Sequence, residues 1–93
     1  MNVLILSKFE HIKYYSFISN LEKLENLNIY FTNISDISFL EKNKNIKELN
    51  LSKCENIEDY SFISNLEKLE NLNLSYIKIS DFSFLKKINI LKN

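Results

Sequence analysis

The sequence predicts a repeat solenoid of the α/β type, with a short parallel β-sheet on its concave face and turns or 3₁₀ segments on its convex face. Two observations lead to this prediction. The segment YSFISNLEKLENLN at residues 15–28 recurs unchanged at residues 60–73, a shift of 45 residues. Each half divides again, because leucines recur at spacings of 23, 22 and 23 residues at Leu4, Leu27, Leu49 and Leu72. Repeat periods of about 20–50 residues are typical of solenoids and related arrays.

The first element of each repeat is a predicted strand of three alternating residues. In Leu27-Asn28-Ile29 the two apolar residues share one face at a period of two, which is typical of a half-buried strand. Such a short strand is not stable alone. Stacked beside the same strand of the next repeat, it forms a parallel ladder whose inward side chains build one continuous core.

The second half of each repeat carries an apolar tail that closes the turn from the opposite side. Phenylalanine recurs at one position of this tail: Phe17, Phe39, Phe62 and Phe84. We expect these four rings to stack as a column along the solenoid. In three repeats an aspartate precedes the tail (Asp36, Asp59 and Asp81), where it can accept backbone N–H bonds and start a 3₁₀ segment. Tyr14 replaces this aspartate in the first repeat, which we therefore expect to be less regular.

Two repeat units carry a family resemblance. LENLNIYFTNISDISFL, from residue 24, and LENLNLSYIKISDFSFL, from residue 69, resemble the leucine-rich repeat pattern L-x-x-L-x-L-x-x-N/C/T-x-I. Their tail, Ile-Ser-Asp-x-Ser-Phe-Leu, is similar to the bacterial internalin-type and SDS22-type subclass, which usually has proline where this chain has Phe39 and Phe84. The resemblance covers nearly the whole chain and implies a leucine-rich-repeat solenoid.

The N/C/T position of the pattern is occupied by Phe9, Thr32, Cys54 and Ile77. The resemblance implies that this side chain packs inward and bonds the neighbouring backbone. Thr32 and Cys54 carry groups that suit this structural role. Phe9 and Ile77 do not, so we expect the buried polar ladder to be interrupted in the first and fourth repeats.

The domain organisation follows from the repeat count. We expect a single leucine-rich-repeat domain over residues 1–93, with about four repeats of 22–23 residues. No capping segment with a polar outer face is recognisable at either end. The open edges of such an array favour either a fragment of a longer repeat protein or end-to-end self-association of two copies.

Composition argues against several classes of partner. The 12 basic residues, all lysine, balance 12 acidic residues, whereas binding to nucleic acid requires a basic surface. The apolar run at residues 3–6 is too short for a signal peptide or a membrane span. We therefore expect no nucleic-acid partner, no membrane insertion and a cytoplasmic location. The residue usage favours a gene from an A/T-rich genome.

Candidates for catalysis and for cofactor binding are few. Cys54 and His11 are the only cysteine and histidine, and the repeat alignment places them two strand spacings apart, about 10 Å. A Cys–His pair would need contact within about 3 Å, so we interpret Cys54 as structural. The chain has no glycine for a phosphate-binding loop and no cluster of metal ligands. We expect a non-enzymatic protein without a metal or another cofactor.

The outward residues of the strands and of the turns that follow them are the candidate binding surface. We hypothesise that Tyr30, Phe31 and Tyr76 anchor an unknown protein partner on the concave face, because aromatic residues are favoured at binding hot spots. Lys53 and an asparagine row frame these rings; the row is Asn28, Asn50 and Asn73. In the competing interpretation the aromatics only cover the end of the ladder, and the stacked amides bond one another on a solvated face.

Two other functions are open at this point. The chain could be a structural spacer, or part of a longer repeat protein, with no partner of its own. The resemblance to the SDS22-type subclass also implies a possible role as the regulatory subunit of an enzyme such as a phosphatase, by analogy alone.

Overall fold

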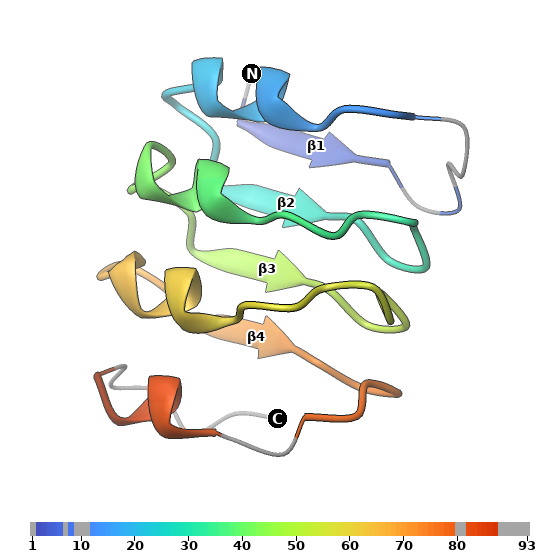
Figure 1. Ribbon diagram of the computed structural model, residues 1–93. Helices are drawn as coiled ribbons and strands as arrows, with labels where there is room; N and C mark the ends of the chain where they lie inside the picture. The colour runs from blue at the N-terminus through green and yellow to red at the C-terminus, as the bar shows by residue number, and fades with distance from the viewer. Residues whose placement is uncertain (1, 7, 9–11, 80–81, 88–93) are drawn as a thin grey trace.

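The computed structural model describes residues 2–6, 8, 12–79 and 82–87. Within them, strands and 3₁₀ helices alternate along the chain, so that each repeat contributes one of each (Figure 1). The elements are β1 (Val3–Ile5), η1 (Ser16–Asn20), β2 (Asn26–Asn28), η2 (Ser38–Glu41), β3 (Glu48–Asn50), η3 (Ser61–Asn65), β4 (Asn71–Asn73) and η4 (Ser83–Lys87). The predicted solenoid, with a sheet on one side and 3₁₀ turns on the other, is confirmed.

The four strands form one parallel sheet in the order β1-β2-β3-β4. Its register aligns the leucines on which the repeat was recognised: Leu4 pairs with Leu27, Leu27 with Leu49, and Leu49 with Leu72. A shift by one residue would move every inward leucine to solvent, so the hydrophobic pattern fixes this register. The outward side of the sheet is called the sheet face below; it is the predicted concave face.

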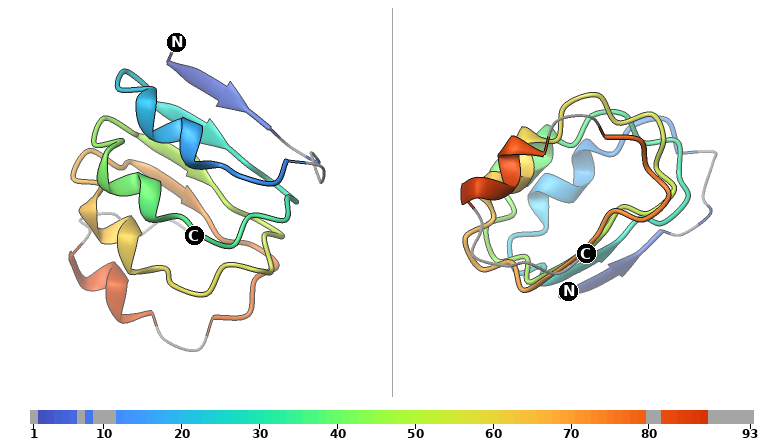
Figure 2. Two further views of the ribbon diagram at one scale, coloured as in Figure 1. Left: turned by 45° about the horizontal axis from the view of Figure 1, so that its top comes forward. Right: turned by 90° about the horizontal axis from the view of Figure 1, so that it is seen from below.

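The hydrophobic core fills the space between the sheet and the column of 3₁₀ helices (Figure 2). The sheet contributes the central leucine of each strand, and the 3₁₀ side contributes branched aliphatic residues such as Ile18, Leu40 and Ile63, which are fully buried. Close contacts between elements join each strand only to the next strand and each 3₁₀ helix only to the next 3₁₀ helix. Stability is therefore a sum of contributions from neighbouring turns, as in other solenoids.

Aspartate side chains start two of the 3₁₀ segments, as predicted. The Ser38 N–H donates to Asp36 Oδ1 at 2.8 Å, and the Ser61 N–H donates to Asp59 Oδ1 at 2.9 Å. Asp81 lies outside the described residues. In the first repeat Tyr14 points to solvent, yet η1 has the same five-residue length as η3. The expectation of a less regular first turn is thus wrong for its 3₁₀ helix, which the buried Ile18 anchors without an aspartate.

Acid is expected to weaken the turn that Asp59 starts. Hydrogen bonds from the Ser61 hydroxyl and from the Ser61 backbone N–H hold the pKa of the Asp59 carboxyl below its usual 3.8. A carboxyl whose pKa is lower in the folded state stabilises the fold above its unfolded pKa, and this contribution is lost as the pH falls through the folded pKa. Asp59→Ala should therefore unfold at lower urea than the wild type at neutral pH, and the difference should narrow when the pH is lowered below 3.8.

The control for this prediction is Glu58→Ala, which removes the adjacent exposed carboxylate. Urea unfolding of the two variants, followed by circular dichroism at both pH values, makes the comparison. If Asp59→Ala lowers the urea midpoint by the same amount at acid and neutral pH, the role assigned to the ionised carboxylate is contradicted.

The expected stacking of the four phenylalanines is wrong, because no ring contact joins any two of them among the described residues. Phe39 and Phe84 are buried and Phe62 is half-buried, but Phe17 is 43% exposed. Phe17 belongs to the first turn of the described array, so no preceding turn covers it. At the other end Phe84 packs on rings from a second position of the repeat, with centroids 6.0 Å from Tyr60 and 6.3 Å from Phe82. Aromatic rings of two repeat positions therefore share the stacking.

A buried asparagine links the first two turns, which the sequence analysis did not anticipate. Asn43 is fully buried at the repeat position that Leu21 and Leu66 occupy in other turns. Its Nδ2 donates to the carbonyl of Ile18 at 2.9 Å and to that of Leu21 at 3.2 Å. Its Oδ1 has no hydrogen-bond partner among the described residues. The amide thus ties η2 to the backbone of the preceding turn and leaves one buried acceptor unsatisfied.

Candidate functional site

A left-handed residue follows each strand. Backbone φ is +63° at Lys8, +56° at Phe31, +61° at Lys53 and +63° at Tyr76, three residues after the last residue of the corresponding strand. This conformation costs about 1–2 kcal/mol for a residue with a Cβ and is usually left to glycine or asparagine. The chain has no glycine, so each turn carries a large side chain in this strained position.

Hydrogen bonds from two directions hold these turns. The N–H of Phe31 donates to the carbonyl of Ser52 at 2.9 Å, and the N–H of Lys53 donates to that of Ser75 at 3.0 Å, which extends the parallel ladder beyond the strands. Within the third turn the Cys54 N–H donates to the Leu51 carbonyl at 3.1 Å. Because the backbone is fixed in this way, the side chains that follow the strands project in set directions.

The asparagine row serves these same turns. Asn28 Oδ1 accepts the N–H of Tyr30 at 3.0 Å, and Asn50 Oδ1 accepts that of Ser52 at 2.9 Å. In the same way, the N–H of Ser75 donates to Asn73 Oδ1 at 2.9 Å. The strand register places the three asparagines side by side on the sheet face. Their oxygens stabilise the backbone of their own turns, a role different from the expected bonding between stacked amides.

Lys53 gathers the aromatic residues that the sequence analysis selected. Its ammonium lies 5.8 Å from the ring centroid of Tyr30, 5.7 Å from that of Phe31 and 5.1 Å from that of Tyr76. The rings of Tyr30 and Phe31 also contact each other, with centroids 6.1 Å apart. These four residues, called the lysine–aromatic cluster below, span the turns after β2, β3 and β4. Ammonium-to-ring contacts within about 6 Å are attractive cation–π interactions.

The cluster is accessible to a partner. Phe31 is 43% exposed and Tyr76 is 78% exposed, whereas Tyr30 and Lys53 are half-buried. Beside it, Ser52 is buried, although the strand pattern predicts an outward residue there. Its hydroxyl donates to Asn50 Oδ1 at 2.8 Å, so it turns back towards the sheet instead of joining the exposed row.

The structural polar residues lie directly beneath this surface. Cys54 is fully buried, and its thiol donates to the Ile29 carbonyl at 2.8 Å. The Thr32 hydroxyl lies 3.6 Å from the Cys54 sulfur and 3.5 Å from the Ile34 N–H. Thr32 and Cys54 therefore link the second and third turns inside the core. His11 and Phe9 lie outside the described residues, and Ile77 is half-buried.

Tyr15 extends this interior network towards the 3₁₀ side. Its ring is buried and its hydroxyl donates to Asn33 Oδ1 at 2.7 Å. Burial raises the pKa of the Tyr15 phenol, and a side-chain hydrogen bond with Thr32 opposes this effect. Because its hydrogen bond to Asn33 reaches the loop of the second repeat, the phenol helps to hold the first turn on the second.

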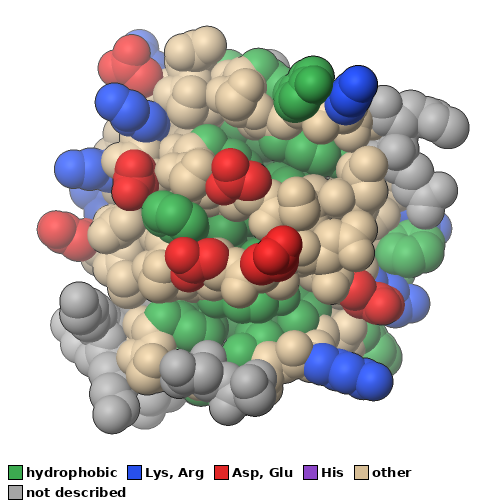
Figure 3. Space-filling view, viewed as in Figure 1, with side chains coloured by type: hydrophobic (Ala, Val, Ile, Leu, Met, Phe, Trp, Pro, Cys, Tyr) green, Lys and Arg blue, Asp and Glu red, His purple; other side chains and the backbone are tan. Residues whose placement is uncertain are grey.

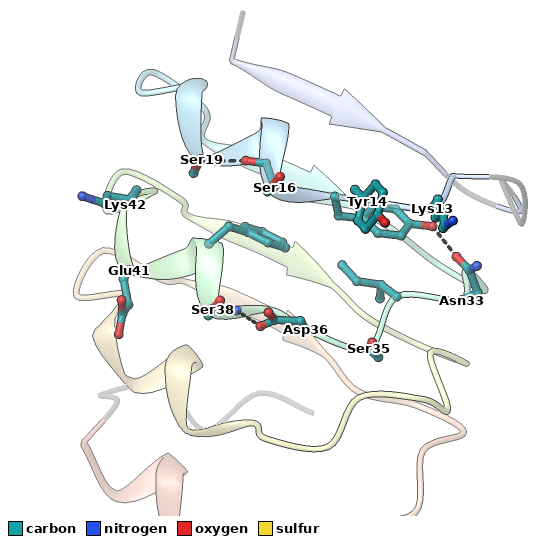
Figure 4. A pocket seen from close by; sticks show the side chains of 13 residues that line it. Lys13, Tyr14, Ser16, Ser19, Asn33, Ser35, Asp36, Ser38, Glu41 and Lys42 are labelled. Carbon is teal, nitrogen blue, oxygen red and sulfur yellow. Dashed lines mark hydrogen bonds between the residues drawn. The ribbon is translucent and has the colours of Figure 1, made fainter.

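A shallow hollow lies away from the sheet, between the first and second turns (Figure 4). Tyr14, Tyr15, Asn33 and Phe39 are among the residues that line it. Several of its polar groups are held within the protein, as in the hydrogen bonds of Tyr15 to Asn33 and of Ser38 to Asp36. These hydrogen bonds give several polar groups of the hollow a structural role.

The 3₁₀ side carries charges of both signs. Figure 3 shows this side, with acidic side chains near the middle of the view and lysines towards its periphery, among polar and apolar atoms. Its one lysine–aromatic contact among the described residues is Lys13 over Tyr14, at 5.6 Å. Tyr14 is 72% exposed, nearly as much as Tyr76, which makes it a matched control for experiments on the sheet face.

The described residues hold no cluster of three or more histidine, cysteine or carboxylate side chains arranged to bind a metal ion. In the same part of the chain, none of the helices has the length and apolar character needed to cross a membrane.

Comparison with known proteins places the repeat in a family. A family model described as leucine-rich repeats, in two copies, matches residues 44–87. The solved structure of an internalin, InlF, from Listeria monocytogenes matches 88% of the chain with a TM-score of 0.75 and 28% sequence identity. Residues 44–87 are therefore leucine-rich repeats. The fold of the chain is internalin-like, as its tail motif suggested.

Other comparisons bear on the fold and on its extent. Internalin C2 from the same organism matches 82% of the chain with a TM-score of 0.57 and 21% identity, which shows a likeness of fold alone. The match covers 25% of the length of InlF and 46% of that of internalin C2. Comparison with curated protein sequences gave no match. The leucine-rich-repeat family and the internalin-like fold indicate a protein–protein interaction module.

Proposed function

We propose that this leucine-rich-repeat chain binds a protein partner through its sheet face, with the lysine–aromatic cluster as the anchor. The observation that carries the proposal is the convergence of Tyr30, Phe31 and Tyr76 around the ammonium of Lys53. Aromatic residues are enriched among interface hot spots because they bury a large area at a small cost in side-chain entropy.

The position of the cluster supports this assignment. Its backbone is fixed by ladder and turn hydrogen bonds, so binding needs little ordering of the main chain. The asparagines of β2, β3 and β4 lie beside it and supply polar groups around the apolar anchor. Interfaces commonly combine an aromatic centre with a polar rim in this way.

The competing functions make different predictions. A spacer would bind nothing through this face, and self-association of copies through the edge strands β1 and β4 would appear as a concentration-dependent mass in light scattering. A regulatory subunit of an enzyme would use the same face for one particular partner. The chain spans only a quarter of the length of InlF, so further repeats or domains would contribute to binding in a longer protein.

Substitution of the cluster tyrosines tests the proposal. A random-peptide display library, selected on the immobilised 93-residue chain, supplies ligands whose affinity is then measured by isothermal titration calorimetry. Tyr30→Ala and Tyr76→Ala should each weaken binding by about 30-fold or more, the loss that defines a hot spot. Tyr14→Ala, which removes an equally exposed ring from the 3₁₀ side, should leave the affinity unchanged.

Two observations decide the outcome. The urea midpoints of all three variants should stay close to that of the wild type, because these side chains lie outside the core. If selected peptides bind Tyr30→Ala and Tyr76→Ala as tightly as the wild type, or lose affinity only for Tyr14→Ala, the sheet face is not the binding surface.

A further inference from the structure

Within the described part of the chain, the ammonium of Lys53 has aromatic neighbours but no anionic partner. The centroids of three rings, two from the preceding turn and one from the following turn, lie within 5.8 Å of Nζ. Among the described residues, no carboxylate lies within 4.0 Å of this ammonium. The rings remove part of its hydration and provide only a weak cation–π attraction in return. A half-buried ammonium in this environment favours an anionic acceptor supplied from outside.

The charged groups nearest in sequence do not fill this role. Glu55 lines a shallow hollow together with Lys53 and Phe31, but it forms no ion pair with the lysine. Glu48 lies at the opposite end of β3, where its carboxylate accepts a hydrogen bond from Asn26 Nδ2 at 3.0 Å. The Lys53 charge is therefore left uncompensated within the described part of the chain.

The neighbouring amides also present donors. The Oδ1 atom of Asn50 is occupied by the N–H and hydroxyl of Ser52, and that of Asn73 by the N–H of Ser75. Because the oxygens accept hydrogen bonds from the backbone, the Nδ2 groups of these two amides are available to donate to a ligand. Neither Nδ2 donates a hydrogen bond to another described residue. The row beside Lys53 thus adds N–H donors, which suit a carboxylate or a peptide carbonyl.

Lys53 further selects against positively charged ligands. Aromatic rings grouped in this way often bind a cation, but here the chain's own lysine already occupies the space over all three rings. A lysine or arginine of a partner would meet a like charge at this position and would be disfavoured.

We infer that the partner segment bound by the cluster is acidic, with an aspartate or glutamate carboxylate paired to Lys53 and an apolar neighbour of that residue packed on Tyr76 and Phe31. This inference rests on the proposed function and specifies the chemistry of the ligand. The ion pair forms in an environment partly screened from water by the rings, where it is stronger than on an open surface.

The test uses the same random-peptide library on the wild type and on Lys53→Gln, which keeps a polar side chain of similar size and removes its charge. Peptides selected on the wild type should be enriched in acidic residues beside an apolar residue. They should bind Lys53→Gln about 10- to 100-fold more weakly, the loss expected for a hydrogen bond to a charged group. Lys53→Arg should retain most of the affinity, because it keeps the charge.

Lys44→Gln is the matched control, since it makes the same charge change at an exposed lysine in the loop that precedes β3, whereas Lys53 follows that strand. Its affinity for the selected peptides should equal that of the wild type. Replacing the key carboxylate of the peptide by its amide should cause the same loss as Lys53→Gln. Combining the two changes should cost little more than either alone if the groups contact each other.

The outcomes separate this inference from the proposed function. Peptides that require Tyr30 and Tyr76 but show no acidic enrichment, or bind Lys53→Gln as well as the wild type, overturn the acidic-ligand inference and leave the binding face standing. Peptides that bind independently of both tyrosines overturn the binding face as well. Loss of affinity in Lys53→Gln, rescue by Lys53→Arg and no effect of Lys44→Gln together support an acidic partner.

Discussion

Replacing Leu49 by alanine is expected to lower the free energy of unfolding by about 2–5 kcal/mol. The Leu49 side chain is almost completely buried at the centre of β3, and its neighbours in the ladder are Leu27 and Leu72. Truncation leaves a cavity that is lined by the turns on both sides. A rigid ladder relaxes little to fill such a cavity. A domain of this size is stable by only about 5–14 kcal/mol, so the loss is a large fraction of the total.

Urea unfolding monitored by circular dichroism measures this loss. The control is Leu4→Ala in the edge strand β1, where the equivalent side chain is only half-buried and has one neighbouring strand, β2. Leu4→Ala should therefore cost clearly less than Leu49→Ala. Equal losses for the two variants would contradict the view that stability is summed over neighbouring turns.

Removing the thiol of Cys54 is expected to have the second-largest effect. Cys54→Ala deprives the Ile29 carbonyl of the donor that lies 2.8 Å away and removes the contact with the Thr32 hydroxyl. A buried polar group that loses its partner destabilises a protein by about 1–3 kcal/mol. Cys54→Val restores the apolar volume without the donor, so it should be destabilised to a similar extent.

Cys54→Thr distinguishes a lost hydrogen bond from a lost volume. Threonine carries a donor and already occupies the equivalent position of the preceding turn as Thr32, which is also buried. It should recover most of the urea midpoint that alanine and valine lose. If Cys54→Val were as stable as the wild type, the thiol would act only as an apolar filler.

Much of the fold could be predicted because its interactions repeat with the sequence. The spacing of Leu27, Leu49 and Leu72 is also the strand register, since each turn brings the same residue onto the same place in the ladder. The aspartates before the 3₁₀ segments act locally, within two residues, so a short motif suffices to predict Asp36 and Asp59. Interactions of this kind depend on few distant groups.

The exceptions arise where a side chain meets a neighbour that the motif does not specify. Phe17 has the same position in its repeat as the buried Phe39, yet it is exposed because no described turn precedes its own, whereas Phe84 packs on Tyr60 of the preceding turn. Asn43 breaks the apolar pattern at a core position and reaches back to two carbonyls of the first turn. No sequence pattern specifies that partner, although an asparagine at a leucine position of the repeat is a signal of an unusual contact.

The sequence analysis selected the residues of the candidate site but did not predict their geometry. Their place in and just after the strands, together with the hot-spot preference, selected Tyr30, Phe31 and Tyr76 as candidate anchors, with Lys53 beside them. The structure adds that the turns after the strands are left-handed and that one ammonium serves all three rings. Both features depend on backbone hydrogen bonds between successive turns, which the residues of a single repeat do not encode.

The sequence by itself determined the repeat period, the inward and outward faces and the stacking of identical positions, because hydrophobic burial acts on every turn in the same way. Only the tertiary structure decided which exposed rings converge, which asparagine oxygens turn to the backbone and that no described carboxylate pairs with Lys53. Those features depend on distances of a few ångströms between side chains of different turns. Such distances follow from the packed three-dimensional array, and the order of residues along the chain does not fix them.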